Sequence, residues 1–98
     1  MSVVVDRSGG AVVAVLLDRP HRHNAMDAAT VEALHEAFTA AEACGARAIV
    51  LGSTRPGMFC SGADLRIDDD ERAAVSDRLY ELYALRLEMG MMFQTSGL

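Results

Sequence analysis

The sequence predicts an α/β fold, because three kinds of apolar segment follow one another. Two runs rich in β-branched residues, Val3–Val5 and Ala11–Leu17, flank a polar turn with a Gly pair, which is typical of a β-hairpin. A longer segment, Asp27–Ala43, repeats its apolar residues at spacings of three and four, as an amphipathic helix does. A third apolar run, Ala48–Leu51, follows directly. The predicted order is therefore strand, strand, helix, strand.

The first predicted helix has recognisable ends. Asp27 is a suitable N-cap, since its carboxylate can accept hydrogen bonds from free amides of the first turn. Gly45 can take the left-handed conformation that closes a helix. His35 lies among Glu side chains on the polar faces, so we expect it to be solvated rather than a catalytic base. The apolar face comprises Val31, Leu34, Ala37, Phe38 and Ala41.

The strand predicted over Ala48–Leu51 is a short unbroken apolar run, which favours a strand covered on both faces and ending at Gly52. The run Ala11–Leu17 is also apolar on both faces. Further along, the acidic run Asp68–Glu71 suits the positive end of a helix dipole. A second long helix is therefore predicted over about Asp70–Met89.

Composition excludes several classes of protein. The 98 residues allow one small domain, and a hydrophobic content of 51% is too high for general disorder. The net charge is −5, from nine basic and fourteen acidic side chains, and no basic run follows a phosphate backbone, so no nucleic acid partner is expected. No signal peptide or membrane-spanning run is apparent. With two cysteines, Cys44 and Cys60, and no disulfide pattern, we expect a soluble cytoplasmic protein.

The segment after the third strand is best suited to chemistry. Turn residues fill Ser53–Gly57, and Ser61–Leu65 then combines Gly62 with Asp64. Gly62 allows the backbone to approach a ligand without a Cβ, and Asp64 can begin a helix by capping its free amides. Amides at such a helix start could bind an oxygen, as an oxyanion hole requires. The alternative on this pattern is a strand, a turn and a capped helix that bind nothing.

His21 and His23 raise the question of a metal site. They lie two residues apart in a loop without a neighbouring Cys or third ligand, so a solvated basic turn is the better interpretation and no metal is expected.

Two ordered segments share a wider pattern. Val50–Leu65 is an apolar run followed by Gly-Ser-Thr-x-Pro-Gly-x-Phe-Cys-Ser-Gly-Ala-Asp-Leu. Upstream, Leu17–Pro20 and then Asn24–Asp27 give Arg-Pro-x-x-x-Asn-Ala-Met-Asp at the entry to the first helix. Together these segments resemble the signature loop and the first helix entry of the enoyl-CoA hydratase/isomerase (crotonase) superfamily. The resemblance covers about Val3 to Glu88.

The resemblance implies an incomplete crotonase-like (ClpP/crotonase) spiral of ββα units, with residues 1–88 as the N-terminal portion of the domain and 89–98 as a divergent, disordered tail. It implies an enoyl-CoA hydratase or isomerase, hence a lyase or isomerase of fatty acid metabolism, that polarises an acyl-CoA thioester carbonyl with backbone amides. No cofactor is implied beyond the coenzyme A of the substrate. Full-length family members are expected to form homotrimers or hexamers.

Roles for particular residues follow from the same resemblance. The amide of Ala63 matches one half of the family's oxyanion hole. Arg22, and in second place Arg19, would meet the phosphates of coenzyme A. The carboxylate of Asp64 is expected to cap the next turn rather than act as a base. The residues expected to border the coenzyme A moiety are Arg22, Ala25, Ser61, Gly62, Ala63, Asp64 and Leu65.

The resemblance ends at Glu88, before the positions where family members supply the second oxyanion amide and their catalytic acids. Whether the 98 residues are active is therefore open. The alternative hypothesis is a truncated, non-catalytic remnant that binds coenzyme A weakly or associates with an intact paralogue.

Overall fold

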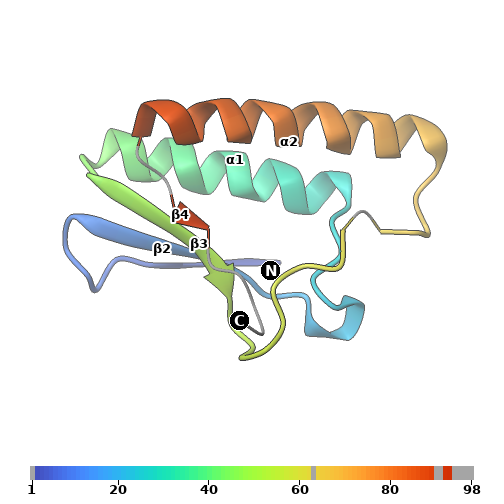
Figure 1. The fold of residues 1–98 in the computed structure, drawn as a ribbon, viewed down its shortest axis with the longest axis horizontal. Coiled ribbons are helices and arrows are strands. Elements are labelled where there is room, and N and C mark those ends of the chain that lie inside the picture. The colour runs from blue at the N-terminus through green and yellow to red at the C-terminus, as the bar shows by residue number, and fades with distance from the viewer. Residues whose placement is uncertain (1, 63, 90–91, 94–98) are drawn as a thin grey trace.

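The computed structural model describes residues 2–62, 64–89 and 92–93. A small sheet forms one layer, one helix covers it, and a second helix lies on the first (Figure 1). This arrangement confirms the predicted α/β class. The elements in chain order are β1 (Val3–Asp6), β2 (Val12–Leu17), the 3-10 helix η1 (Pro20–Arg22), α1 (Ala28–Ala43), β3 (Ala48–Ser53), α2 (Asp69–Met89) and β4 (Met92–Phe93).

The described strands form one sheet in the order β1-β2-β3-β4. β1 and β2 are antiparallel, with Val3 opposite Leu17, which confirms the predicted hairpin. β2 and β3 are parallel, with Val12 opposite Ala48, and η1 and α1 supply the crossover that a parallel pair needs. Because β2 and β3 run the same way, the loops that follow them leave from the same edge of the sheet. The candidate site forms at that edge.

The strand predicted over Ala48–Leu51 is confirmed as β3, but the expected stop at Gly52 is not seen. β3 continues through Ser53, since Gly52 pairs with Leu16 and Ser53 pairs with Leu17. Thr54 then donates its amide hydrogen to the Leu17 carbonyl oxygen at 3.1 Å. Gly52 lacks a side chain but keeps its backbone donor and acceptor, so the pairing with β2 carries the strand past it.

The sequences of these strands suit cover on both faces, and in the described part of the chain α1 supplies cover on one face. Val13, Val15 and Leu17 point to the helix-covered face of β2 and are buried. The alternating residues point to the other face, where Leu16 is half-buried and Val12 is 43% exposed. α1 therefore covers one face of the sheet, and the opposite face keeps apolar surface open.

Helix α1 has the caps and the buried face that its sequence predicts. Asp27 accepts hydrogen bonds from the Thr30 amide at 2.9 Å and from the Thr30 hydroxyl at 2.7 Å. Gly45 adopts the left-handed conformation after the last turn, with φ of 83°. Leu34 and Phe38 are fully buried against the sheet. This face of α1 forms the centre of the core.

Helix α2 spans Asp69–Met89, which confirms the helix predicted over about Asp70–Met89, and Asp64 does not begin a helix. The residues between form a turn, and the carboxylate of Asp68 caps the helix by accepting a hydrogen bond from the Glu71 amide at 2.7 Å. Of the predicted disordered tail, the structure describes Met89 at the end of α2 and Met92–Phe93 as β4. Residues 90–91 and 94–98 lie outside the described part.

Candidate functional site

Two loops come together at the edge of the sheet, and backbone hydrogen bonds join them. The first loop connects β2 to α1, and the second connects β3 to α2. The Met26 amide donates to the Gly62 carbonyl oxygen at 2.8 Å, and the Met26 carbonyl oxygen accepts from the Asp64 amide at 2.8 Å. The Ser61 amide donates to the His23 carbonyl oxygen at 3.1 Å. Ala63 itself lies outside the described residues, but both of its neighbours are fixed to Met26.

Asn24 fastens the first loop to the sheet and to the second loop. Asn24 is 1% exposed. Its side-chain oxygen Oδ1 accepts a hydrogen bond from the Arg19 amide at 2.7 Å. Its Nδ2 donates to Ser53 Oγ at 2.9 Å and to the Phe59 carbonyl oxygen at 2.7 Å. The backbone has φ of 56°, a left-handed conformation that Asn tolerates better than most residues. Asn24 belongs to the motif at the first helix entry, but the motif alone predicts no role for it.

Arg19 makes a second set of contacts, with charged and carbonyl oxygens of both loops. Its Nη1 donates to the Ala25 carbonyl oxygen, and its Nη2 lies 3.5 Å from Asp27 Oδ2 and 3.6 Å from Asp64 Oδ2. The Arg19 side chain is 11% exposed. Because these contacts occupy its guanidinium, Arg22 is the better placed of the two arginines to meet a ligand.

The carboxyl group of Asp27 is tuned by the same contacts. Burial raises its pKa, but the hydrogen bonds from Thr30 and the positive charge of Arg19 outweigh that effect and lower the pKa overall. Asp27 therefore stays ionised and continues to cap α1 at any pH near neutrality.

Asp64 is a buried carboxylate at the start of a turn. Its Oδ1 accepts from the Arg66 amide at 2.9 Å, which confirms the expected turn cap. The Arg66 Nε atom lies 3.8 Å from the same oxygen, but the Arg66 side chain is 64% exposed. Asp64 is thus held by Arg19 from the inside and by Arg66 from the solvent side.

A surface pocket of about 480 Å³ lies between the two loops. Arg22, Ala25, Ser61, Asp64 and Leu65 were all expected to border coenzyme A, and all five line this pocket. Gly62 is not among the lining residues, and Ala63 is outside the described part. The binding roles themselves stay predictions. The described residues that line it are His21, Arg22, His23, Ala25, Ser61, Asp64, Leu65 and Arg66.

Cys60 contributes to the loop rather than to reactivity. Its thiol donates to the Asn24 carbonyl oxygen at 3.2 Å, and its sulfur accepts from the Gly62 amide at 3.3 Å. Burial raises the pKa of the Cys60 thiol, so the nucleophilic thiolate is scarce at neutral pH. Both Cys60 and Cys44 are free cysteines.

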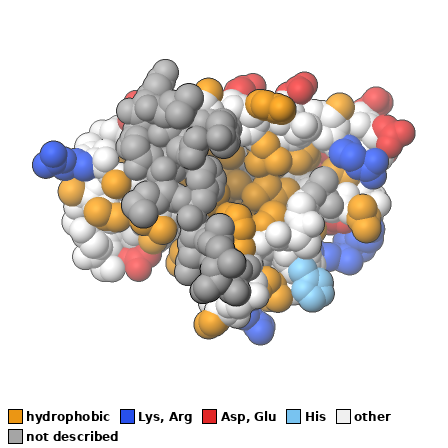
Figure 2. All heavy atoms as spheres, viewed as in Figure 1, with side chains coloured by type: hydrophobic (Ala, Val, Ile, Leu, Met, Phe, Trp, Pro, Cys, Tyr) orange, Lys and Arg blue, Asp and Glu red, His pale blue; other side chains and the backbone are white. Residues whose placement is uncertain are grey.

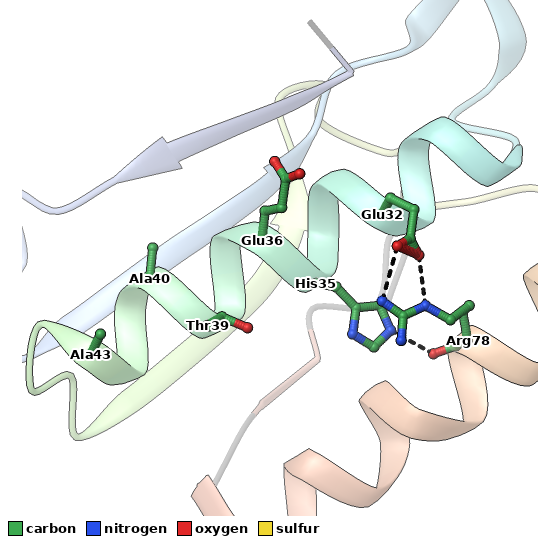
Figure 3. Close-up of a pocket in the computed structure, with 7 residues that line it drawn as sticks. All are labelled: Glu32, His35, Glu36, Thr39, Ala40, Ala43 and Arg78. Carbon is green, nitrogen blue, oxygen red and sulfur yellow. Dashed lines mark hydrogen bonds and ion pairs between the residues drawn. The ribbon is translucent and has the colours of Figure 1, made fainter.

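A second pocket, of about 580 Å³, lies between α1 and α2 (Figure 3). Glu32 of α1 accepts two hydrogen bonds from the Arg78 guanidinium, at 2.6 and 3.0 Å, and these lower the Glu32 pKa. His35 is half-buried, and its Nε2 lies 2.8 Å from the Arg78 carbonyl oxygen, so the expectation of a solvated His35 is wrong. These groups bind one another and hold the helices together. None of the described residues that were expected to bind a ligand lines this pocket.

Within residues 2–62, 64–89 and 92–93, no three His, Cys, Asp or Glu side chains gather closely enough to hold a metal ion. No helix in that same part of the chain has the length and apolar character needed to cross a membrane.

The fold is that of the crotonase superfamily, and sequence comparison agrees. Residues 7–91 match the family model described as enoyl-CoA hydratase/isomerase. The chain therefore belongs to the enoyl-CoA hydratase/isomerase family. It is 44% identical over 73 residues to a Mycobacterium tuberculosis protein named "Probable enoyl-CoA hydratase echA6", an alignment that covers 74% of this chain and 29% of that protein.

A more distant relative and two solved structures extend the comparison. An Arabidopsis thaliana protein named "Probable enoyl-CoA hydratase 2, mitochondrial" is 37% identical over 60 residues, covering 60% of this chain and 20% of its own. An enoyl-CoA hydratase from Thermoplasma volcanium shares the fold with a TM-score of 0.83 at 21% identity, over 99% of this chain and 41% of that one. An enoyl-CoA hydratase from Mycobacterium smegmatis has a TM-score of 0.75 at 27% identity, over 95% of this chain and 38% of that one. The aligned part of the chain thus spans under a third of the length of the Mycobacterium tuberculosis and Arabidopsis thaliana proteins.

Proposed function

We propose that this chain binds an acyl-CoA thioester in the pocket between its two loops and polarises the thioester carbonyl there. The observation that supports the proposal is the convergence of five candidate residues, from segments about forty positions apart, on one pocket of about 480 Å³. Asn24 and Arg19 hold these segments in place with buried hydrogen bonds and ion pairs. A pocket built this way is ready before the ligand arrives, which lowers the cost of binding.

The chemistry of the lining suits such a ligand. Arg22 and Arg66 provide positive charge for phosphate oxygens, and charge-assisted hydrogen bonds of this kind are the stronger ones. Leu65 is 88% exposed and offers apolar surface to the pantetheine arm. In the proposed mechanism the Ala63 amide donates a hydrogen bond to the thioester carbonyl oxygen and stabilises the negative charge that develops on it. Hydration or isomerisation of the bound acyl group is the proposed activity of the whole protein.

Binding is tested by titrating the chain with coenzyme A in a calorimeter. Arg22→Gln removes a charge from the pocket and should weaken binding by roughly tenfold, as expected for the loss of one charged hydrogen bond. Arg7→Gln is the matched control, because Arg7 lies in the exposed turn between β1 and β2. Equal affinity for all three proteins, or no binding by the wild type, would contradict the proposal.

Carbonyl polarisation needs a separate measurement. A thioester labelled with ¹³C at the carbonyl should show a lower stretching frequency by infrared difference spectroscopy when it binds. Ala63→Pro deletes the proposed amide donor and should abolish the shift, whereas Ala63→Ser keeps the amide and should preserve it. In an active whole enzyme, loss of one such donor costs about 10² to 10³ in turnover. A shift that survives Ala63→Pro would rule out this amide.

The second candidate function is association with another polypeptide of the same family. Apolar surface supports it, because Val4 and Val12 are 39% and 43% exposed. Figure 2 also shows hydrophobic side chains gathered in a hollow between α2 and the region of η1. Contiguous apolar surface of this kind marks interaction sites. Sedimentation velocity between about 1 and 100 μM tests it, and a monomer throughout that range would refute self-association.

A further inference from the structure

We propose that Arg19 is a positioning residue that neutralises Asp64 and so makes the pocket acceptable to an anionic ligand. The inference rests on the proposed coenzyme A binding and goes further, since it assigns a role to a residue that does not line the pocket. Asp64 is the one acidic side chain among the described residues that line it. A phosphate entering the pocket would meet that negative charge unless a cation balances it.

The geometry places Arg19 behind Asp64. Arg19 Nη2 lies 3.6 Å from Asp64 Oδ2, and the two side chains are 11% and 7% exposed. Arg66 Nε is 3.8 Å from the other carboxylate oxygen, but this side chain is 64% exposed and stands on the ligand side. Because Arg19 balances the negative charge of Asp64, Arg66 remains available to a phosphate. Without Arg19, Arg66 would be the main counter-ion of Asp64 and would contribute less to a ligand.

The same guanidinium also sets the relative position of the two loops. Nη1 donates to the Ala25 carbonyl oxygen of the first loop, while Nη2 lies between Asp27 at the start of α1 and Asp64 of the second loop. A planar group with several donors can serve three oxygens in this way, whereas the single ammonium of Lys cannot do so with the same geometry. The charge of Arg19 balances Asp64, and its planar shape lets one side chain reach all three oxygens.

The test is a rescue experiment with coenzyme A as the titrant. A free carboxylate about 8 Å from a phosphate, at an effective dielectric constant near 20, weakens binding by roughly 30-fold. Screening at an open pocket reduces this to the order of tenfold, which is the effect expected for Arg19→Gln. Adding Asp64→Asn to Arg19→Gln removes the unbalanced charge and should restore affinity to within about threefold of wild type. A merely structural role for Arg19 predicts that the second substitution restores nothing.

The matched control uses an arginine–aspartate pair outside the pocket. Arg72 Nη1 lies 3.3 Å from Asp69 Oδ1 in the first turn of α2, where both side chains are exposed. Arg72→Gln, alone or with Asp69→Asn, should leave coenzyme A affinity within about twofold, because exposed pairs contribute little. Equal losses from Arg72→Gln and Arg19→Gln would overturn the inference.

A measurement without ligand separates this inference from the proposed function. Hydrogen exchange by NMR at the Met26 and Asp64 amides measures the opening of the hydrogen bonds that join the two loops. Exchange at the Phe38 amide, in the middle of α1, measures the opening of the core. Arg19→Gln should speed exchange at the two loop amides by about tenfold or more and leave Phe38 nearly unchanged. If wild type ignores coenzyme A but exchange changes as described, coenzyme A binding fails and the positioning role stands. If wild type binds and neither affinity nor exchange responds, the positioning role fails alone.

Discussion

Replacing Asn24 by Ala should destabilise the chain severely, since this side chain joins three segments. Alanine leaves the Arg19 amide and the Phe59 carbonyl without their present partners, and each unsatisfied buried group costs about 1–3 kcal/mol. A left-handed backbone, here with φ of 56°, costs an alanine about 1 kcal/mol more. With water reaching part of the network, we expect a loss of about 3 kcal/mol in the free energy of unfolding. For a domain of this size that lowers Tm by at least about 10 °C.

Urea unfolding followed by far-ultraviolet circular dichroism is the assay, since the chain has no Trp. Asn24→Gly loses the same hydrogen bonds but accepts the left-handed backbone, so it should be about 1 kcal/mol less harmful than Asn24→Ala. Thr39→Ala, on the exposed side of α1, is the control and should change stability by less than about 0.5 kcal/mol. A loss below about 1 kcal/mol for Asn24→Ala would refute the view that this network organises the site.

Three other predictions concern the core, pH and association. Phe38→Ala should cost about 3–5 kcal/mol in urea unfolding, because the ring is fully buried, and a small loss would show that the core collapses around the cavity. The Asp27 pKa is lowered on folding, so its contribution to stability is complete above pH about 4 and is lost as the pH falls through the lower folded-state pKa. Asp27→Asn keeps a capping oxygen and should flatten the fall of the urea midpoint below pH about 4, and an unaltered pH profile would count against this assignment. Val12→Glu places a charge on the open face of the sheet and should reduce concentration-dependent sedimentation, whereas unchanged association would locate the contact elsewhere.

Local sequence patterns predicted the helices and strands well where the interactions that form an element lie within a few residues of one another. The spacing of Leu34 and Phe38 follows the helical period, and the Asp27 and Gly45 caps depend on contacts within a few residues. The extension of β3 past Gly52 could not be predicted in this way, because it depends on pairing with Leu16 and Leu17, more than thirty positions earlier. Apolar composition on both sides of a strand likewise did not reveal that one side stays partly open.

The candidate site shows the same division. Residues carried over from the family motifs, such as Arg22 and Leu65, do gather at one pocket. The sequence left open whether Asp64 begins a helix or caps a turn, because both use the same carboxylate-to-amide hydrogen bond and differ only in whether helical turns follow. Asn24 was missed because its partners, Ser53 and Phe59, are 29 and 35 positions away. The signal available in the sequence was an Asn in a tight turn that contains no Gly, since Asn is the residue most suited to a left-handed conformation there.

Helix α2 has a consequence for the order in which the molecule opens. It packs on α1 through Val75 and Leu82, with Arg78 bridging to Glu32 at the solvent edge, while the sheet lies on the far side of α1 (Figure 1). Detaching α2 therefore exposes the interface between the two helices and leaves the hydrogen bonds among β1, β2 and β3 intact. Such outer units open at lower free energy than the interior they cover. Partial unfolding, proteolytic cleavage and exchange with another polypeptide would therefore begin at the interface between α1 and α2. The hydrogen bonds between the two loops of the candidate site would still be formed at that stage.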